Sequence, residues 1–229
     1  MPHDSSPNAR HTVLGRVRLR APLPPARASA RAAQWRGAVG ALFADDPDFH
    51  GHVQGGTAMR FPPVQYRWLD DAPALWALDD AANRAMSFPW TAQTLRLGTD
   101  EVAIDGVHWE VAPVAIAPSS KLLRYAFGAP WMALSQENYA RFQHLSPTQR
   151  RAELDRILVG NLLMLGRALG WTQEGTLFAA FEQVSELAVP LKDVTLRAFS
   201  GRFVVNLSLP DHLALGRSVS HGYGWFVRD

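Results

Sequence analysis

Residues 148–170, TQRRAELDRILVGNLLMLGRALG, contain the clearest secondary-structure signal in the chain. Apolar side chains recur in this stretch every three to four residues and form one continuous face, which is typical of an amphipathic helix. This face consists of Leu154, Ile157, Leu158, Leu162, Leu165 and Leu169. Gly170 comes directly after it, and glycine is a frequent residue at a helix C-terminus. The stretch therefore predicts a long helix that covers a sheet or another helix.

Extended segments surround this helix in the second half of the chain. In residues 201–210, GRFVVNLSLP, apolar and polar side chains alternate with a period of two, which indicates a strand with one buried face. Residues 194–199, VTLRAF, also have the composition of a strand. Residues 106–118 and 119–134 predict two further strands upstream of the helix. The second half is therefore expected to combine a sheet with one main helix.

The first half has a similar order of elements. Residues 13–20, VLGRVRLR, alternate like a strand, and residues 22–43 begin with prolines and continue with a helical pattern. Residues 59–69, MRFPPVQYRWL, predict an edge or bulged strand, because proline cannot donate to a neighbouring strand. Residues 74–86 predict a short helix, and residues 95–106 predict a hairpin. These patterns predict an α+β fold of two tandem ferredoxin-like domains, residues 10–105 and 106–229.

Composition limits the class of protein. The chain has 229 residues, 47% of them hydrophobic, which is enough for two small packed domains or a single large one. No apolar run approaches the roughly 18 residues of a membrane span, and the polar start MPHDSSPNARH lacks a secretory signal. Cysteine is absent, which excludes disulfides, thiolate nucleophiles and cysteine-bearing zinc sites. We therefore expect a soluble cytoplasmic protein without a membrane partner.

Arginine supplies almost all of the positive charge. The formal net charge is only +2, and Lys121 and Lys192 are the two lysines. Arginine has a planar guanidinium that matches phosphate groups and stacks on bases. Arg16, Arg18 and Arg20 share one face of the predicted first strand, spaced about 6.6 Å apart. This face would suit successive phosphates, or it is a solvated outer face.

The C-terminal residues 209–229, LPDHLALGRSVSHGYGWFVRD, form a glycine-rich segment. Glycine lets backbone N–H groups approach an anion closely, and serine hydroxyls add donors. The segment lacks the ending of a Walker loop, and no helix follows it as in a dinucleotide fingerprint. It suits a polynucleotide backbone, although an ordinary glycine-rich hairpin explains it equally well. The candidate binding residues are Gly216, Arg217, Ser218, Ser220, His221, Gly222 and Gly224.

Two histidines, His50 and His52, lie in the loop of residues 49–68, FHGHVQGGTAMRFPPVQYRW. In an extended segment, side chains at i and i+2 point to the same side, so both imidazoles could face one ligand. They could be a general acid/base pair, because imidazole titrates near neutral pH, or bystanders. They could also be metal ligands, for which a third ligand would be needed. The candidates for that third ligand are His108, Asp46 and Asp48.

Three stretches together resemble the CRISPR-associated pre-crRNA processing endoribonucleases of the RAMP superfamily, in the subgroup with a paired-histidine site. Residues 49–68 are similar to that subgroup's "FHNH…RYPLVQYK" region. Residues 125–142, YAFGAPWMALSQENYARF, and 156–171, RILVGNLLMLGRALGW, resemble its C-terminal half. Residues 201–226 resemble its terminal "F.G.F..N..LPD..GLGKSVSRGFG" stretch. The matches occur in family order, from about residue 36 to the C-terminus.

This resemblance implies two tandem ferredoxin-like, RRM-type domains and a specific activity. Family members cut the repeat RNA of a CRISPR transcript without a metal or cofactor. The 2′-hydroxyl beside the scissile bond attacks the phosphorus and leaves a 2′,3′-cyclic phosphate and a 5′-hydroxyl. The family's active-site histidines fall on His50 and His52, and its RNA-contacting loop on the glycine-rich residues 216–224. Arg60, at the start of the strand after the histidines, is a further candidate RNA-binding residue. Implied partners are repeat RNA or crRNA, other CRISPR effector subunits and a second copy of the chain.

The sequence departs from the family pattern in places. His221 replaces a usual arginine, Arg217 replaces lysine, and Gly51 replaces asparagine between the histidines. The changes at His221 and Gly51 favour a second hypothesis, a non-catalytic subunit that binds crRNA within an effector complex. A third hypothesis is a metal-dependent hydrolase with His50 and His52 as ligands.

Overall fold

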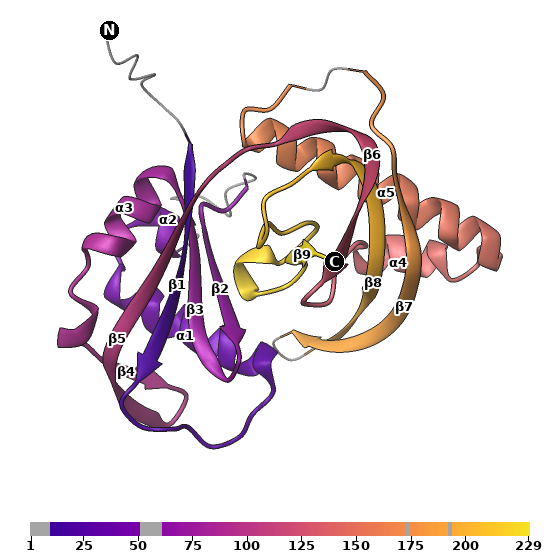
Figure 1. Ribbon diagram of the computed structural model, residues 1–229. Coiled ribbons are helices and arrows are strands. Elements are labelled where there is room, and N and C mark those ends of the chain that lie inside the picture. The colour runs from indigo at the N-terminus through magenta and orange to yellow at the C-terminus, as the bar shows by residue number, and fades with distance from the viewer. Residues whose placement is uncertain (1–9, 51–60, 173–174, 192–193) are drawn as a thin grey trace, which may run out of the picture. The chain divides into compact units, whose positions relative to one another are not determined.

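The computed structural model describes residues 10–50, 61–172, 175–191 and 194–229. The chain divides into two compact units, one ending at Val114 and one beginning at Ala115 (Figure 1). Each unit contains one antiparallel sheet with helices, so the predicted α+β class is confirmed. None of the helices in the described part of the chain is long and apolar enough to cross a membrane.

The boundary between the units lies later than the predicted one at residues 105 and 106. That position falls inside β5 (Asp100–Pro113). The second half of β5 continues to pair with β1 (His11–Leu19), where His108 lies opposite Arg16 and Val111 opposite Val13. Residues 106–113 therefore complete the first sheet, and the strand predicted over 106–118 is not a separate element.

The first unit has a five-stranded sheet in the order β2-β3-β1-β5-β4, with every pair antiparallel. Its remaining elements are α1 (Ala28–Leu42), α2 (Pro47–His50), β2 (Val64–Leu69), β3 (Ala72–Leu78), α3 (Asp79–Ser87), a short 3-10 helix η1 (Trp90–Ala92) and β4 (Thr94–Leu97). As predicted, β2 is an edge strand and residues 95–106 contain a hairpin, formed by β4 and β5.

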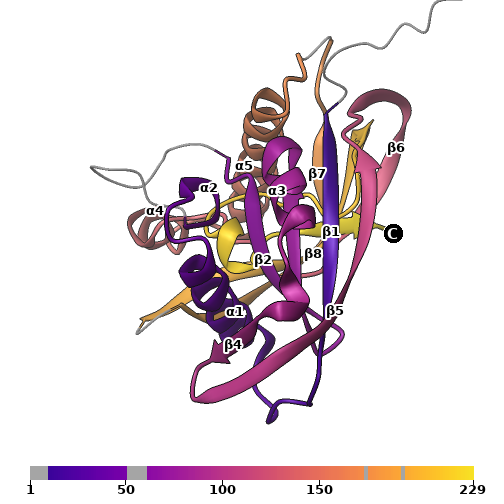
Figure 2. The same ribbon diagram turned by 90° about the vertical axis from the view of Figure 1, so that its left-hand side faces the viewer.

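The core of the first unit lies between the sheet and two helices. Trp35 and Val39 of α1 are fully buried in the same apolar cluster as Ala81 and Ala85 of α3, so both helices cover one face of the sheet (Figure 2). The indole N–H of Trp35 donates to the carbonyl of Ala74 at 2.9 Å, which ties α1 directly to β3. The helical pattern predicted in residues 22–43 is confirmed by α1.

The helix predicted over residues 74–86 is only half correct. Residues 74–78 belong to β3, and α3 begins at Asp79, whose φ of 51° breaks the strand. Leu75 faces the core beneath α1, while Trp76, on the opposite face of the strand, is also buried. A strand buried on both faces is a continuous apolar run, and such a run cannot be distinguished from a buried helix by periodicity.

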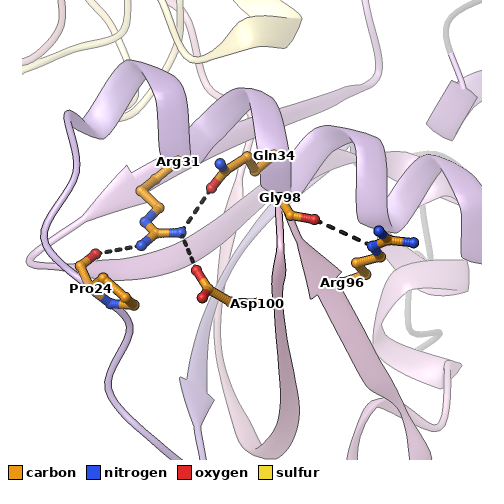
Figure 3. Close-up of polar contacts among 6 residues, drawn as sticks. All are labelled: Pro24, Arg31, Gln34, Arg96, Gly98 and Asp100. Carbon is orange, nitrogen blue, oxygen red and sulfur yellow. Dashed lines mark hydrogen bonds and ion pairs between the residues drawn. The ribbon is translucent and has the colours of Figure 1, made fainter.

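Two arginines of the first unit, Arg31 and Arg96, form hydrogen bonds within the fold. Arg31 is almost fully buried and donates to the side chain of Gln34 at 2.9 Å, to the carboxylate of Asp100 at 3.4 Å and to the carbonyl of Pro24 (Figure 3). These contacts join the proline-rich connection after β1 to α1 and to the β4–β5 turn. In that turn, Nε of Arg96 donates to the carbonyl of Gly98 at 3.3 Å (Figure 3).

The arginine row on β1 is a solvated face with ion pairs. Arg16 contacts the carboxylates of Asp70 at 3.0 Å and Glu110 at 3.2 Å, and Arg18 contacts Asp105 at 2.6 Å. Acidic neighbours therefore compensate both of these cations. Arg16 and Arg18 therefore match the solvated outer face, the second of the two interpretations that their spacing allowed.

The second unit has a four-stranded antiparallel sheet in the order β7-β8-β6-β9. Its elements are β6 (Ala117–Phe127), α4 (Gln136–Phe142), α5 (Pro147–Ala168), β7 (Ala179–Leu191), β8 (Val194–Ser208), a 3-10 helix η2 (Val219–His221) and β9 (Phe226–Arg228). The predicted strands 194–199 and 201–210 are one continuous strand, β8, which forms a long hairpin with β7.

The long helix α5 confirms the strongest sequence prediction. It begins with a capping box, in which Ser146 and Gln149 bond each other's backbone N–H groups, and Gly170 after it has a φ of 75°. The leucines of the predicted face are buried, and Ile157 at the edge of that face is half-buried. The carboxylate of Asp155 accepts from the N–H of Phe181 at 2.8 Å, which joins α5 to β7.

Candidate active site and glycine-rich loop

His50 lies at the C-terminal end of α2, and its side chain is exposed. The preceding residue, Phe49, is buried and stacks on Phe43 with 3.9 Å between ring centroids. The hydroxyl of Tyr66 donates to the carbonyl of Phe49 at 2.7 Å. Burial raises the pKa of Tyr66, which keeps this hydroxyl protonated and able to donate. The backbone at His50 is therefore fixed by a buried aromatic anchor, although the imidazole itself is accessible.

Charged contacts fix the other side of α2. Arg84 of α3 donates to Asp46 at 2.7 Å and to Asp48 at 2.5 Å. These two carboxylates were candidate metal ligands, and here a guanidinium occupies both. No group of three histidine, aspartate or glutamate side chains within the described residues could hold a metal ion. The described part of the site therefore gives no support to the metal-ligand hypothesis.

The imidazole of His50 lies against α1. Its Nδ1 is 3.4 Å from the carbonyl oxygen of Gly40. A carbonyl oxygen can only accept, so a hydrogen bond here would be donated by Nδ1, and the lone pair of the neutral ring would then be on Nε2. A Cβ on Gly40 would come within 3.3 Å of Nδ1, which is closer than ordinary van der Waals contact. Because Gly40 is buried and has no side chain, it leaves room for the imidazole of His50 to pack against α1.

Arg36, one helical turn before Gly40, reaches the same site. Its guanidinium donates to the carbonyl of His50 at 3.1 Å. The residue thus fixes the His50 backbone and brings a permanent positive charge close to the imidazole. Neither Arg36 nor Gly40 was predicted as a site residue. Their spacing of four residues on α1 places them on one helix face, but nothing in the sequence connects that face with His50.

The other two predicted residues of this region, His52 and Arg60, lie outside the described residues. Of the predicted site residues in the first unit, the structure thus places His50 alone. The remaining predicted residues belong to the glycine-rich segment of the second unit.

The glycines of that segment are required by the backbone. Gly216, Gly222 and Gly224 have φ angles of 86°, 86° and 70°. A Cβ on Gly224 would lie 2.1 Å from the carbonyl oxygen of Leu215, so no side chain fits there. Turn geometry therefore explains these glycines without any ligand.

Several backbone donors of the segment are already engaged within the protein. The N–H groups of Arg217, His221, Gly222 and Gly224 donate to the carbonyls of Met132, Ser218, Val219 and Pro130 at 2.9–3.1 Å. They are not available as an anion cradle. The side chains of the segment are thus better candidates for binding than these four N–H groups.

Among those side chains, Arg217 is the most accessible. It is exposed, and its guanidinium has no hydrogen-bond or ion-pair partner among the described residues. Ser218, Ser220 and His221 are half-buried. Tyr223 is buried, and its hydroxyl donates to the carbonyl of Pro190 at 2.7 Å, so it packs in the core and cannot stack on a base.

The outer face of the second sheet is polar. Arg124 on β6 makes two bonds to Glu182 on β7, and Arg202 on β8 lies 2.8 Å from Asp229. The two arginines lie on the central strands of the sheet, where RRM-type proteins place base-stacking aromatics. The described residues therefore provide no such stacking platform on this face.

Comparisons with known proteins agree with this architecture. The model of the Cas6b N-terminal domain matches residues 15–112, and that of the Cas6b C-terminal domain matches residues 117–228. An uncharacterized protein of Methanocaldococcus jannaschii, MJ0978, is 34% identical over 110 residues, which are 48% of this chain and 75% of that protein.

Solved structures of similar fold extend over almost the whole chain. A crystal structure of Cas6b has a TM-score of 0.83 at 24% identity and covers 96% of this chain and all of its own. The structure of a CRISPR RNA processing endoribonuclease Cas6b has a TM-score of 0.73 at 23% identity, with the same coverage. Csf5, a type IV Cas6 crRNA endonuclease, has a TM-score of 0.64 at 15% identity, over 96% of this chain and 99% of its own. The predicted tandem ferredoxin-like fold is confirmed.

Proposed function

Because the chain belongs to the Cas6b family, we propose that it is an endoribonuclease that cuts CRISPR repeat RNA to make crRNA. A solved protein of the same fold is itself a CRISPR RNA processing endoribonuclease. The observation that carries the proposal is the placement of His50: an accessible imidazole on a fixed backbone, with Nδ1 directed at a carbonyl. A ring held in this way is suited to proton transfer through Nε2.

The proposed reaction is a metal-independent transesterification. The ribose 2′-hydroxyl loses its proton and attacks the adjacent phosphorus, while the 5′-oxygen gains a proton and leaves. The products are a 2′,3′-cyclic phosphate and a 5′-hydroxyl, and no water is consumed. His50 and His52 together supply the base and the acid, each typically worth about 10²–10⁴-fold in rate. The guanidinium of Arg36, beside His50, would offset negative charge that develops on the phosphorane.

RNA binding is assigned to Arg60 and to the glycine-rich segment. In that segment we propose that Arg217, Ser218, Ser220 and His221 contact RNA through their side chains. Gly216, Gly222 and Gly224 shape the backbone that presents them. Repeat RNA is the proposed partner, with no cofactor, and the cytoplasm is the proposed location. Other CRISPR effector subunits and a second copy of the chain are further candidate partners.

The test of this function is mass analysis of the ends formed from the host's own repeat RNA. We expect one fragment to end in a 2′,3′-cyclic phosphate and the other to begin with a 5′-hydroxyl. Fragments with a 3′-hydroxyl and a 5′-phosphate would instead indicate hydrolysis by an activated water. RNA bound at normal affinity without any product between pH 6 and 8 would indicate the non-catalytic crRNA-binding subunit.

Substituting Gly40 tests the placement of the imidazole. We expect Gly40→Ala to lower the single-turnover cleavage rate about tenfold, because its Cβ would push Nδ1 away by a few tenths of an ångström. The affinity for repeat RNA should change less than about twofold. Gly37→Ala is the matched control, since it lies on the same helix and its Cβ would meet nothing within 4 Å. Equal cleavage rates in the two variants would contradict this role of Gly40.

A further inference from the structure

A hollow lies beside the glycine-rich segment, within the second unit. It is lined by the chain between Leu134 and Tyr139, by the first residues of β8 and by Arg217. Arg217 is a predicted RNA-binding residue, whereas the other lining residues have no role in the reaction proposed above.

One wall of the hollow is an unpaired stretch of strand edge. Phe199 on β8 exchanges two backbone hydrogen bonds with Trp131, on the edge opposite β7. Backbone groups of alternate residues point to the same edge, so those of Thr195 and Arg197 point the same way as those of Phe199. After Met132 the chain leaves this edge toward α4. Among the described residues, no strand pairs with the edge of β8 at Thr195 and Arg197.

Two guanidinium groups border the hollow, while the nearby carboxylates have partners. Arg197 is 49% exposed and lies 3.7 Å from Glu186, too far for a hydrogen bond. Glu186 accepts at 2.6 Å from the hydroxyl of Tyr139, and this bond raises the pKa of Tyr139, so Glu186 keeps a donor if Arg197 moves away. Glu137 is bonded to Arg141 at 2.6 Å. Arg197 can therefore turn to a ligand at little cost.

We propose that this hollow binds the RNA strand where it continues from the glycine-rich segment, with one phosphate on Arg197 and a neighbouring one on Arg217. Backbone N–H groups at the open edge of β8 would donate to phosphate or base oxygens. The site deepens the proposed function and rests on it. An extended peptide could pair with the same edge, but a neutral one would leave Arg217 without a counter-charge and Arg197 with only its 3.7 Å contact to Glu186. An RNA strand would supply acceptors for the backbone N–H groups at the edge of β8 and negative charge for the two guanidinium groups.

The test measures binding of labelled repeat RNA to the full chain by fluorescence anisotropy, in a His50→Ala background in which cleavage is expected to be at least about 10²-fold slower. Arg197→Ala should weaken binding about fivefold and lower the slope of log Kd against log salt by about 0.7, the share of one phosphate on a single strand. Arg156→Ala is the matched control, an exposed arginine on α5 with the same loss of charge. It should change affinity less than about twofold.

The same series locates the subsite. RNAs shortened stepwise from either end should reach a length at which Arg197→Ala and its parent bind equally, because the contacted phosphate is then missing. If Arg197→Ala and Arg156→Ala bind full-length RNA with the same affinity and the same salt slope, the subsite does not exist. Pairing of the open edge with a peptide would then be the remaining explanation. That outcome differs from failure of the proposed function, which would appear as absence of cleavage by the unmodified protein.

Discussion

Replacing His50 or His52 with alanine is expected to lower the single-turnover cleavage rate of repeat RNA at least about 10²-fold. The reason is chemical: each variant removes one of two groups that move a proton in the same step. The affinity for RNA should persist, because binding is assigned to arginines and to the glycine-rich segment of the second unit. His50 is exposed, so its removal leaves no cavity that would destabilise the fold.

The measurement is the observed rate with enzyme in excess over labelled RNA, alongside the dissociation constant of each variant. His144→Ala is a suitable control, because His144 is also an exposed histidine but lies before α5 in the other unit. It should cleave at the unmodified rate. The acid/base role of the pair would be refuted by unchanged rates in both His50→Ala and His52→Ala.

The parts of the fold that could be predicted from the sequence are those with one buried face. Helix α5 presents leucines on one side and polar residues on the other, and Phe203, Val205 and Leu207 alternate along β8. In both cases the spacing of the apolar residues indicates which side of the element packs against the core. Where both faces are buried, as along β3, the same reasoning gives the wrong element, because the alternation disappears.

The candidate site was predictable only in part, for a different physical reason. The paired histidines and the glycine-rich segment are local in sequence and could be recognised from it. The position of the His50 imidazole and backbone depends on the carbonyl of Gly40, the guanidinium of Arg36 and the hydroxyl of Tyr66. These three groups come together only because α1 packs on β2. A backbone carbonyl has no sequence signature, so this part of the site required coordinates.

The glycine-rich segment is a local signal with two physical explanations. Glycines at 216, 222 and 224 suggested N–H groups close to an anion. The structure instead uses their positive φ angles to fold the turn, and N–H groups of the segment bond Met132 and Pro130. Sequence alone cannot separate the two uses, since both need a residue without Cβ.

A single 2′-deoxy substitution at the cut site is expected to abolish cleavage, with a loss of at least about 10³-fold in the single-turnover rate. The 2′-oxygen is the proposed nucleophile, and without it neither histidine has a proton to remove or a reaction to assist. Binding should change little, because one ribose hydroxyl adds only a small part of an interface dominated by phosphates. The matched substrate carries the same deoxy substitution one nucleotide away from the cut and should be cleaved normally.

The same assay with excess EDTA separates this chemistry from its metal-dependent alternative. Transesterification by two imidazoles should proceed at an unchanged rate in EDTA, whereas a hydrolase that activates water on a metal would stop. That hydrolase would also cut the deoxy substrate, because water rather than the ribose supplies its attacking oxygen. Since Arg84 already holds Asp46 and Asp48, such an enzyme would have to find its remaining ligands elsewhere. Cleavage of the deoxy RNA that is lost in EDTA would therefore overturn the proposed mechanism while leaving the family assignment intact.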